Sequence, residues 1–384
     1  MAKSKKKQDS SKDILKLHQK TGGKIKTVPT VSLKDRANLA RFYTPGVGIV
    51  AQHLAKHPED ARTFSWKKNS VAIISDGSAV LGLGNIGPYG ALPVMEGKAL
   101  LFSGLAGIDA IPIVLDTQNP DEIIKTVCAI APGFGGINLE DIAAPQCFDI
   151  ERTLIEKLSV PVMHDDQHGT AIAIFAGLLN AVKVVGKKLS TTRMVIVGAG
   201  AAGSATADLL QEAGVQKILV VDRKGILAPI REDLGAHKRA LAERTNPSGV
   251  MGSLEDALLG SDVVIGLSGA GRLSEAMIQK MAPGAIVFAL ANPIPEIMPE
   301  EAKRGGAVVV GTGRSDFPNQ INNALVFPGV FRGALDREVS EITMAMKIRA
   351  GKALAGLVAT PTSKNIMPDI RDPRVVPTIA RAIR

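Results

Sequence analysis

A glycine-rich turn at residues 198–203, GAGAAG, constrains the fold more than any other part of the sequence. It follows the β-branched run Met194–Val197, opens into the helical run Ser204–Ala213, and precedes a second strand-like run, Lys217–Val221, that ends in Asp222. A tight turn between a strand and a helix lets a pyrophosphate approach the backbone at the positive end of the helix, and an acid about 20 residues later suits ribose hydroxyls. We therefore predict a Rossmann-type nicotinamide dinucleotide site.

The same glycine spacing occurs at Gly82, Gly84 and Gly87, so the pattern alone does not locate the dinucleotide. Here Pro88 follows the last glycine at once, and the next strand ends at Asp116, 32 residues after Gly84. This context differs from the strand–turn–helix unit that binds dinucleotides. We interpret the first copy as a loop of a substrate domain.

The second copy supplies the predicted cofactor contacts, which are Gly198, Ala199, Gly200, Ala201, Ala202, Gly203 and Asp222. Asp222 favours a free 2′-hydroxyl and hence NAD, whereas the adjacent Arg223 and Lys224 are able to accept a 2′-phosphate. We expect NAD, with NADP left open.

From about Val71 onward, short β-branched runs alternate with longer helical stretches, a pattern typical of βαβ units and parallel sheets. The predicted strands are Val71–Ser75, Ile108–Leu115, Gly136–Asp141 and Val160–Asp165, then Met194–Val197, Lys217–Asp222, Asp262–Leu267, Ala285–Leu290 and Ala307–Val310. The helical run Gly169–Val184 separates the two series, and helices follow Pro328.

These runs predict an α/β fold of two domains. We expect a substrate- and metal-binding domain with a mainly parallel sheet over residues 29–166 and a Rossmann-type domain over residues 167–340. A basic, poorly ordered tail precedes them at residues 1–28, and a helical segment at residues 341–384 packs back on the domains.

The net charge of +9 is concentrated at the N-terminus, where residues 1–26 hold nine lysines and two aspartates; the rest of the chain carries +2. A lysine-rich run without interleaved aromatic or arginine residues is typical of a solvated tail, so a nucleic-acid partner is not expected. No stretch approaches the about 20 apolar residues of a membrane span. The two cysteines, Cys128 and Cys147, lack metal-type spacing. We expect a soluble, cytoplasmic protein without a membrane partner.

Four carboxylates are expected at one rim of the first sheet. Glu140 and Asp141 end one predicted strand, and Asp165 and Asp166 end the next. A right-handed crossover makes such strands parallel, so their carboxyl ends meet at one edge, where open α/β sheets bind ligands. An all-oxygen cluster suits Mg²⁺ or Mn²⁺, which would neutralise the like charges. A solvated acidic edge and helix capping by Asp165 and Asp166 are the competing interpretations.

A tyrosine and a lysine have chemistry that can serve this rim. Tyr43 lies in the Pro/Gly-rich turn RFYTPGVG, which can hold a phenol over a cleft or simply anchor the turn. Lys98 lies in the mostly apolar helical run PVMEGKALLF. It either extends to the surface or lies beside the acidic rim, where burial lowers its pKa and carboxylates raise it. The sequence leaves both alternatives open.

Several motifs resemble those of the short prokaryotic malic enzymes, in the same order and over about residues 30–380. They are YTPGV, SDGSAVLGLGNIGP, MEGKALL, NLEDI, HDDQHGTA, VGAGAAG, ANPIPE, GTGRSDFPNQINNALVFPG and FRGALD. The resemblance implies oxidative decarboxylation of (S)-malate to pyruvate and CO₂ with reduction of NAD(P)⁺, by a Mg²⁺- or Mn²⁺-dependent homodimer. The residue roles that it implies are Tyr43 as general acid, Lys98 as general base supported by Asp165, Glu140, Asp141 and Asp166 as metal ligands, Asn292 as a further cofactor contact, and Asn323 as a substrate contact.

One departure concerns the substrate carboxylate. Larger animal-type malic enzymes resemble the chain around GLGNIG but carry an arginine just upstream that binds malate, where this chain has Ser78 and Ala79. The partner of that carboxylate therefore stays open. No phosphate acetyltransferase-like extension follows residue 384, so we expect an unfused form.

Two alternative functions remain at this point. A metal-independent amino-acid-type dehydrogenase also pairs a catalytic lysine with a Rossmann domain, although the adjacent Glu140 and Asp141 argue against it. The second is a cofactor-binding regulatory protein whose lysine-rich tail contacts nucleic acid.

Overall fold

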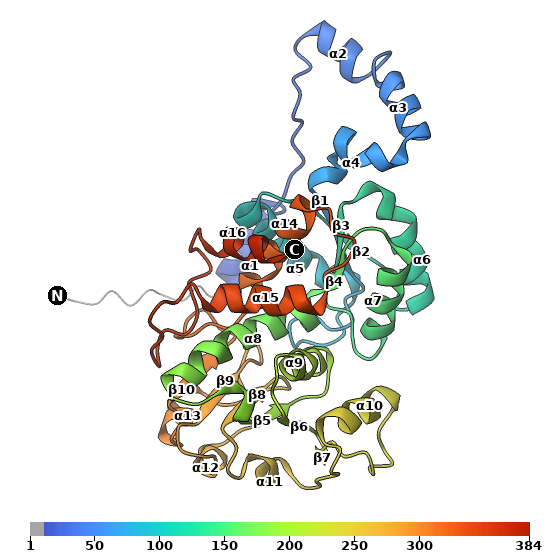
Figure 1. Ribbon diagram of the computed structural model, residues 1–384. Helices are drawn as coiled ribbons and strands as arrows, with labels where there is room; N and C mark the ends of the chain where they lie inside the picture. Colours follow the sequence, from blue (N-terminus) through green and yellow to red (C-terminus); the bar gives the residue numbers. More distant parts are fainter. Residues whose placement is uncertain (1–10) are drawn as a thin grey trace, which may run out of the picture.

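The computed structural model describes residues 11–384, which form two sheet-centred domains and a projecting arm (Figure 1). The first domain holds a parallel sheet in the order β2-β1-β3-β4. Its strands are β1 (Ser70–Ser75), β2 (Asp109–Val114), β3 (Gly136–Leu139) and β4 (Val162–His164). Its helices are α5 (Gly87–Ala106), α6 (Pro120–Ile130), the 3₁₀ turn η3 (Ala131–Gly133) and α7 (Gln146–Lys157).

Strand β1 shows why both faces of this sheet are covered. Its six residues are all buried, and successive side chains of a strand point to opposite faces. Val71 and Ile73 belong to the hydrophobic cluster that includes residues of α5, whereas Ala72 and Ile74 belong to the cluster with residues of α6 and α7. A continuous apolar run is what a strand covered on both faces requires.

The second domain is a six-stranded sheet in the order β10-β9-β8-β5-β6-β7. Its strands are β5 (Arg193–Val197), β6 (Lys217–Asp222), β7 (Gly225–Ile226), β8 (Val263–Gly266), β9 (Ile286–Ala289) and β10 (Val309–Thr312), and its helices are α9 (Ala201–Glu212), α10 (Ala236–Thr245), α11 (Leu254–Leu258), α12 (Glu275–Gln279) and α13 (Pro299–Arg304). All pairs are parallel except β6 with β7. The chain leaves β5 toward β6 and continues on the other side of β5 with β8. This reversal creates the crevice where Rossmann-type sheets bind ligands.

Helix α8 (Asp165–Val184) connects the two domains, and most of its residues are buried. The C-terminal helices are α14 (Phe327–Asp336), α15 (Met344–Ala355) and α16 (Val375–Ala382), and the short turns are η4 (Leu189–Thr191) and η5 (Asn323–Leu325). α15 packs on α8, while α14 packs on α5 and α16. One hydrophobic cluster therefore runs from β1 through α8 to β5, and it joins both domains.

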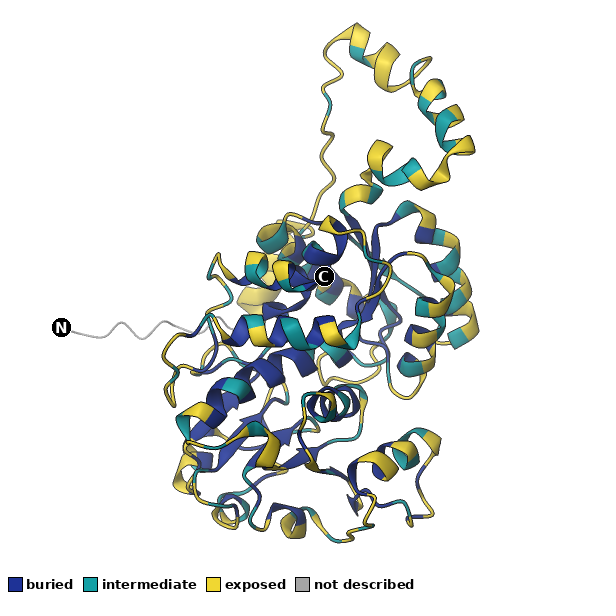
Figure 2. Ribbon diagram, in the orientation of Figure 1, coloured by how far each residue is buried: buried dark blue, intermediate teal, exposed yellow. Residues whose placement is uncertain are grey.

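An arm of residues 28–69 extends away from both domains at the top of Figure 1, except at its end, where Arg62 donates to the Leu335 carbonyl and Lys67 to the Phe134 carbonyl. It holds α2 (Arg36–Phe42), α3 (Val47–Lys56), η1 (Pro58–Asp60), α4 (Ala61–Phe64) and η2 (Trp66–Asn69). Figure 2 shows it in the exposed and intermediate colours, and within the described stretch 11–69 no residue is buried. Its large apolar side chains therefore face solvent; they include Val28, Leu33, Leu39, Phe42, Val47, Ile49, Phe64 and Trp66.

The fold class is confirmed: two α/β domains, the second of Rossmann type. The predicted tail at residues 1–28 needs correction, because Ser11–Thr21 form helix α1 and Lys24 Nζ donates to the carbonyl of Pro93 over 2.7 Å. Residues 1–10 lie outside the described part. The predicted strand ends lie within two residues of the observed ones: Lys217–Asp222 has the predicted bounds, most other predicted strands are slightly too long, and the last begins and ends two residues early. The two-residue strand β7 was not predicted. Within residues 11–384, no helix is long and apolar enough to cross a membrane.

Candidate active site

A cavity of about 1090 Å³ lies where the two domains meet. It is lined by the ends of β3 and β9, by the first turns of α8 and α9, and by one face of α5. The predicted site residues among its lining are Lys98, Glu140, Asp141, Asp166, Gly200, Ala201, Ala202, Asn292 and Asn323. The structure thus brings together residues from six separate motifs.

Lys98 is buried at the acidic rim, with 8% of its side chain exposed. Its ammonium donates to Asp165 Oδ2 over 2.6 Å and lies 2.7 Å from Glu140 Oε1. The same nitrogen lies 4.3 Å from the centre of the Phe327 ring. The surface-lysine interpretation is therefore wrong. Burial lowers the pKa of Lys98, but the charges of Asp165 and Glu140 outweigh it and raise this pKa above its usual range.

Glu140, Asp141 and Asp166 converge so closely that one oxygen from each lies within 4.8 Å of the others. Asp141 is held by its backbone N–H, which donates to Asp166 Oδ2 over 2.8 Å, and its φ of 54° turns the chain away from β3. The strand ends at Leu139, so both carboxylates follow it in the loop. One oxygen of Asp141 is buried without a hydrogen-bond partner among the described residues. The donor set and this unpaired oxygen fit a hard divalent cation.

Burial and mutual repulsion make it unfavourable for all three carboxyl groups of this cluster to be ionised at the same time. Burial raises the pKa of Asp141 to about 7, with a further contribution from the charge of Asp166. Burial also raises the pKa of Glu140 well above its usual value, although Lys98 opposes the shift. Such groups retain protons unless a cation neutralises them. The solvated-edge interpretation is therefore wrong, because Glu140 and Asp141 are buried and Asp166 is only partly exposed.

The capping interpretation of Asp165 and Asp166 is also wrong. α8 begins at Asp165 itself, its N-cap residue is His164, and no side chain caps the backbone there. Asp165 lies beneath Lys98 and packs over Gly169, where an added Cβ would come within 1.8 Å of Asp165 Oδ1. The sequence pattern HDDQHG therefore supplies both the carboxylate and the space for it.

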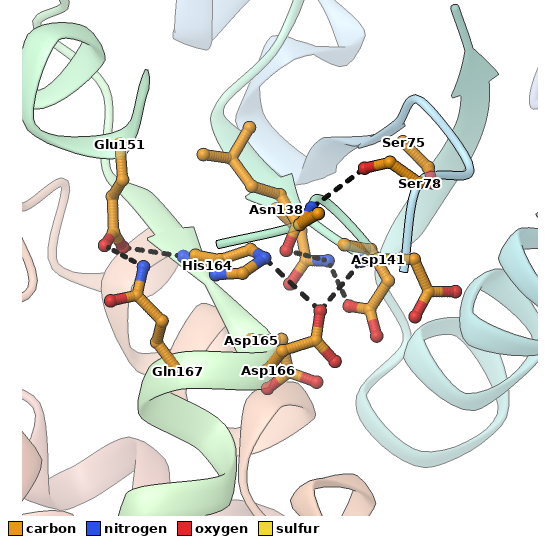
Figure 3. A network of polar contacts seen from close by, with 12 residues as sticks. Ser75, Ser78, Asn138, Asp141, Glu151, His164, Asp165, Asp166 and Gln167 are labelled. Atoms are coloured by element: carbon orange, nitrogen blue, oxygen red, sulfur yellow. Dashed lines mark hydrogen bonds and ion pairs between the residues drawn. The ribbon is translucent and has the colours of Figure 1, made fainter. Parts of the chain in front are cut away.

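A second set of polar residues fixes Asp166 from behind (Figure 3). His164 Nε2 lies 3.3 Å from Asp166 Oδ2, and the backbone N–H of His164 donates to Glu151 Oε1 over 2.7 Å. Glu151 Oε2 accepts from Gln167 over 2.9 Å. The prediction did not include Glu151, because an acid inside the amphipathic helix α7 gives no sequence signal that it is buried.

The loop before α5 approaches the Rossmann domain closely. Gly82 has φ 75°, and a Cβ there would meet the carbonyl oxygen of Asn292 at 2.4 Å. Ser78 stands where the larger animal-type enzymes carry an arginine. Its hydroxyl group already has partners: it donates to Asp76 over 2.6 Å and accepts from the Ala143 N–H over 2.8 Å. The first glycine motif therefore forms a tight contact between the two domains.

The second glycine motif has the form expected of a dinucleotide turn. An added Cβ at Gly198 would meet the Leu267 carbonyl oxygen at 2.4 Å, and one at Gly203 would meet the Gly198 oxygen at 1.9 Å. Gly200 instead borders open space at the start of α9 and lines the cavity. Two glycines thus allow close packing and the third leaves room for a ligand.

Glu296 organises the two loops opposite this turn. It is fully buried, and its carboxylate accepts from the backbone N–H groups of Ser268 (2.9 Å) and Ala291 (3.0 Å). Ser268, Ala291 and Asn292 all line the cavity. The motif ANPIPE carries this acid, but sequence alone gave it no role. Asp222, at the end of β6, lies beyond the cavity lining and is held by Arg231 and Lys238.

Tyr43 is the one predicted catalytic residue that the structure keeps apart from the others. It lies on the arm between α2 and α3, is 65% exposed, and is not among the described residues that line the cavity. His18 and Lys24, by contrast, line the cavity although the prediction assigned them to a tail. Lys24 and Lys98 are the two lysines among its described lining residues.

Comparison with known proteins agrees with this geometry. The family description "Malic enzyme, N-terminal domain" matches residues 22–155, and "Malic enzyme, NAD binding domain" matches residues 167–383. The chain is 51% identical over 364 residues to the NAD-dependent malic enzyme of Geobacillus stearothermophilus, which covers 94% of this chain and 76% of the relative. The chain belongs to the malic enzyme family. The resemblance inferred from the motifs is therefore confirmed.

Relatives of this malic enzyme differ in the cofactor that they are named for. This chain is 47% identical over 344 residues to the NADP-dependent malic enzyme of Halomonas elongata, and the match covers 89% of this chain and 80% of that relative. The crystal structure of the NAD-dependent malic enzyme from Thermotoga maritima matches with a TM-score of 0.93 and 46% identity, covering 97% of this chain and 98% of that one. Asp165 and Asp166 lie between the two family matches, so the acidic rim forms at the junction of the domains.

Proposed function

We propose that this chain oxidises (S)-malate with NAD⁺ or NADP⁺ and releases pyruvate and CO₂, in a reaction that requires Mg²⁺ or Mn²⁺. The observation that carries the proposal is the buried ammonium of Lys98, 2.7 Å from a carboxylate of the three-acid cluster, in a cavity that also contains the dinucleotide turn. Family membership favours this reaction over the amino-acid-type dehydrogenase and the regulatory protein.

Glu140, Asp141 and Asp166 would hold the metal ion, because their oxygens converge and one of them lacks a partner within the described chain. When bound, the ion supplies positive charge that acidifies the C2 hydroxyl of malate and stabilises the enolate formed on loss of CO₂. A dinucleotide held at the turn Gly198–Gly203 would supply the acceptor for the C2 hydride. His164 and the Asp141 backbone N–H orient Asp166 for this task.

A cation at the acidic rim would offset the carboxylate charges that keep Lys98 protonated, so that its ammonium can release a proton to solvent. As a neutral amine, Lys98 takes the proton of the C2 hydroxyl as the C2–H bond breaks. The oxaloacetate formed then loses its C4 carboxylate as CO₂, and the electron pair of the C3–C4 bond becomes the enolate of pyruvate. A proton delivered to C3 completes the product. Asp165 holds Lys98 at the reacting hydroxyl, and Asn323, which lines the cavity, contacts the substrate.

Tyr43 delivers the C3 proton in the cavity of a second copy of the chain. The arm that carries it has exposed apolar residues on α2, α3 and α4, and helices this short need packing to be stable. An exposed apolar surface of this kind marks an interface. We therefore infer a homodimer whose arms are exchanged, with each site built from both protomers.

The experiment is an absorbance assay at 340 nm with the purified chain, malate and Mn²⁺, with each dinucleotide tested in turn. Reduction of the dinucleotide with one pyruvate formed per hydride transferred is expected. Reduction that yields oxaloacetate but no pyruvate, or turnover of amino acids without metal, would overturn the proposal.

A further inference from the structure

The acid that ends β6, Asp222, is already fully engaged by basic groups. Its Oδ1 accepts from Arg231 Nη1 (3.0 Å) and the Lys224 backbone N–H (3.0 Å), and its Oδ2 accepts from Lys238 Nζ (2.8 Å) and Arg231 Nη2 (3.3 Å). A carboxylate offers about four acceptor positions, so these donors fill them. Only 11% of the side chain is exposed. Asp222 can accept from a ribose 2′-hydroxyl only if one of these donors leaves.

Arg231 is the donor least able to leave. Its side chain is 7% exposed, and it also donates to both oxygens of Asp233 and to the carbonyls of Gly225 and Ile226. Those carbonyls belong to β7, the short strand that pairs with the end of β6. Arg231 therefore fixes the Asp222 carboxylate as part of the fold.

Lys238 is bound to Asp222 and also accessible. Its side chain is 40% exposed, and its ammonium has three N–H donors, of which the contact with Asp222 uses one. The preceding residue, His237, lies 3.0 Å from the Ser204 hydroxyl of α9 and stacks on Phe148 at 3.8 Å. These contacts hold the first turn of α10, with Lys238, beside the end of β6.

The surroundings of Asp222 carry net positive charge. Residues 222–238 include four basic side chains, Arg223, Lys224, Arg231 and Lys238, and three acidic ones, Asp222, Glu232 and Asp233, giving +1. Arg223 and Lys224 follow Asp222 directly and are exposed. A ribose 2′-phosphate carries a charge of about −1.5 to −2 and three acceptor oxygens, so it complements such a group of donors.

Resting on the proposed function, we propose that residues 222–238 form a site for the 2′-phosphate of NADP, and that this dinucleotide is preferred over NAD. Lys238 binds the phosphate while it stays on Asp222, and Arg223 and Lys224 contribute further donors. Asp222 acts here as a positioning residue for Lys238, in place of its usual contact with ribose hydroxyls.

Fluorescence titration of the purified chain with NADPH and NADH tests the proposal independently of turnover. NADPH is expected to bind at least about tenfold more tightly than NADH, and 2′-AMP should displace it at lower concentration than 5′-AMP. Lys238→Ala should reduce the NADPH/NADH affinity ratio by about tenfold to a hundredfold, the range for one lost hydrogen bond to a charged group. Arg223→Ala should reduce the same ratio by a smaller factor.

Lys280→Ala is the matched control, because Lys280 has a similar exposure of 45% and pairs with Glu255 elsewhere in the same domain. Its affinity ratio should equal that of the wild type. A wild-type preference for NADH, or a ratio that Lys238→Ala leaves unchanged, would overturn the NADP assignment. The proposed reaction fails separately if either dinucleotide binds but malate with Mn²⁺ yields no pyruvate.

Discussion

The acidic rim and the arm carry the two residues expected to exchange protons with the substrate. The two residues differ in how far the rest of the chain surrounds them. At the rim, Lys98 is 8% exposed and is held by residues of two other elements of the same chain. On the arm, Tyr43 is 65% exposed, and its neighbours Phe42 and Val47 face solvent as well. The difference teaches that one chain completes the surroundings of the proposed base and metal ligands, whereas the proposed acid is left exposed and, in our proposal, is completed by a second chain.

Removal of the metal tests the rim most strongly. Activity should fall to background in excess chelator and return with Mn²⁺, because the three clustered carboxylates then lose the charge that neutralises them. The assay is malate-dependent absorbance at 340 nm, with thermal melting to verify that the protein stays folded. Full activity in chelator would contradict the metal assignment, and Lys98 would then be the only rim residue with a proposed catalytic role.

Lys98→Ala should lower kcat by at least about a hundredfold, the usual effect of losing a general base. Lys125→Ala, an exposed lysine on α6, is the control and should retain full activity. The same kinetic assay measures both, and circular dichroism compares their folds. Near-normal turnover of the Lys98 variant would contradict its role.

Tyr43→Phe should also lower kcat by about a hundredfold, whereas Tyr89→Phe, at the chain's other tyrosine, should not. Mixing separately inactive Tyr43→Phe and Lys98→Ala chains, after dissociation and reassociation, then sharpens the comparison. If arms are exchanged, half of the dimers are mixed and each has one intact site, so about a quarter of wild-type activity should return. No recovery, despite mixed dimers detected by mass spectrometry, would mean that each chain uses its own Tyr43.

Ile49→Asp should dissociate the dimer, because this exposed arm residue would be buried between copies. Ile230→Asp is the matched control, since both side chains are 75% exposed but Ile230 lies in the Rossmann domain. Light scattering coupled to size exclusion measures the mass of each variant. Equal masses for both variants would show that the arm has no role in assembly.

Glu151→Gln should have the smallest effect, a loss of about 1–3 kcal/mol in the free energy of unfolding at neutral pH. Burial raises the pKa of Glu151, but His168, Lys347 and His164 together outweigh it and lower this pKa to about 2 from 4.5. A depressed carboxyl pKa stabilises the fold above about pH 4.5, and this contribution fades as the pH falls toward 2. Urea unfolding of both forms across this range measures the difference, which should shrink with acidity.

The sequence predicted the features that depend on chain direction. Parallel strands place their carboxyl ends together, so the sequence alone predicts that Glu140, Asp141 and Asp166 lie at one edge. The sequence could not predict that Lys98 is buried, because an apolar helix carrying one lysine is compatible with a surface position. The sequence also could not predict that Tyr43 lies on an exposed arm away from the cavity, because a Pro/Gly-rich turn is compatible with either position.

The sequence also could not predict contacts between charged side chains that lie apart along the chain. Asp222 follows the dinucleotide pattern, but the pattern is silent about Arg231 and Lys238, which determine whether its oxygens are available. Strand β7 escaped prediction because two residues are too few for an alternating pattern. Helix α8 begins four residues before the predicted start, because Asp165 and Asp166 at its first turn look like loop residues.

Helix α8 has a consequence for how the chain can change over evolution. Its 20 residues begin with Asp165 and Asp166 and continue into the core shared by both domains. Inserting or deleting one residue within it would rotate one end relative to the other by about 100°. The two aspartates would then leave the rim even if every other side chain were preserved. Changes of length should therefore be confined to surface loops, and this helix should keep its residue count.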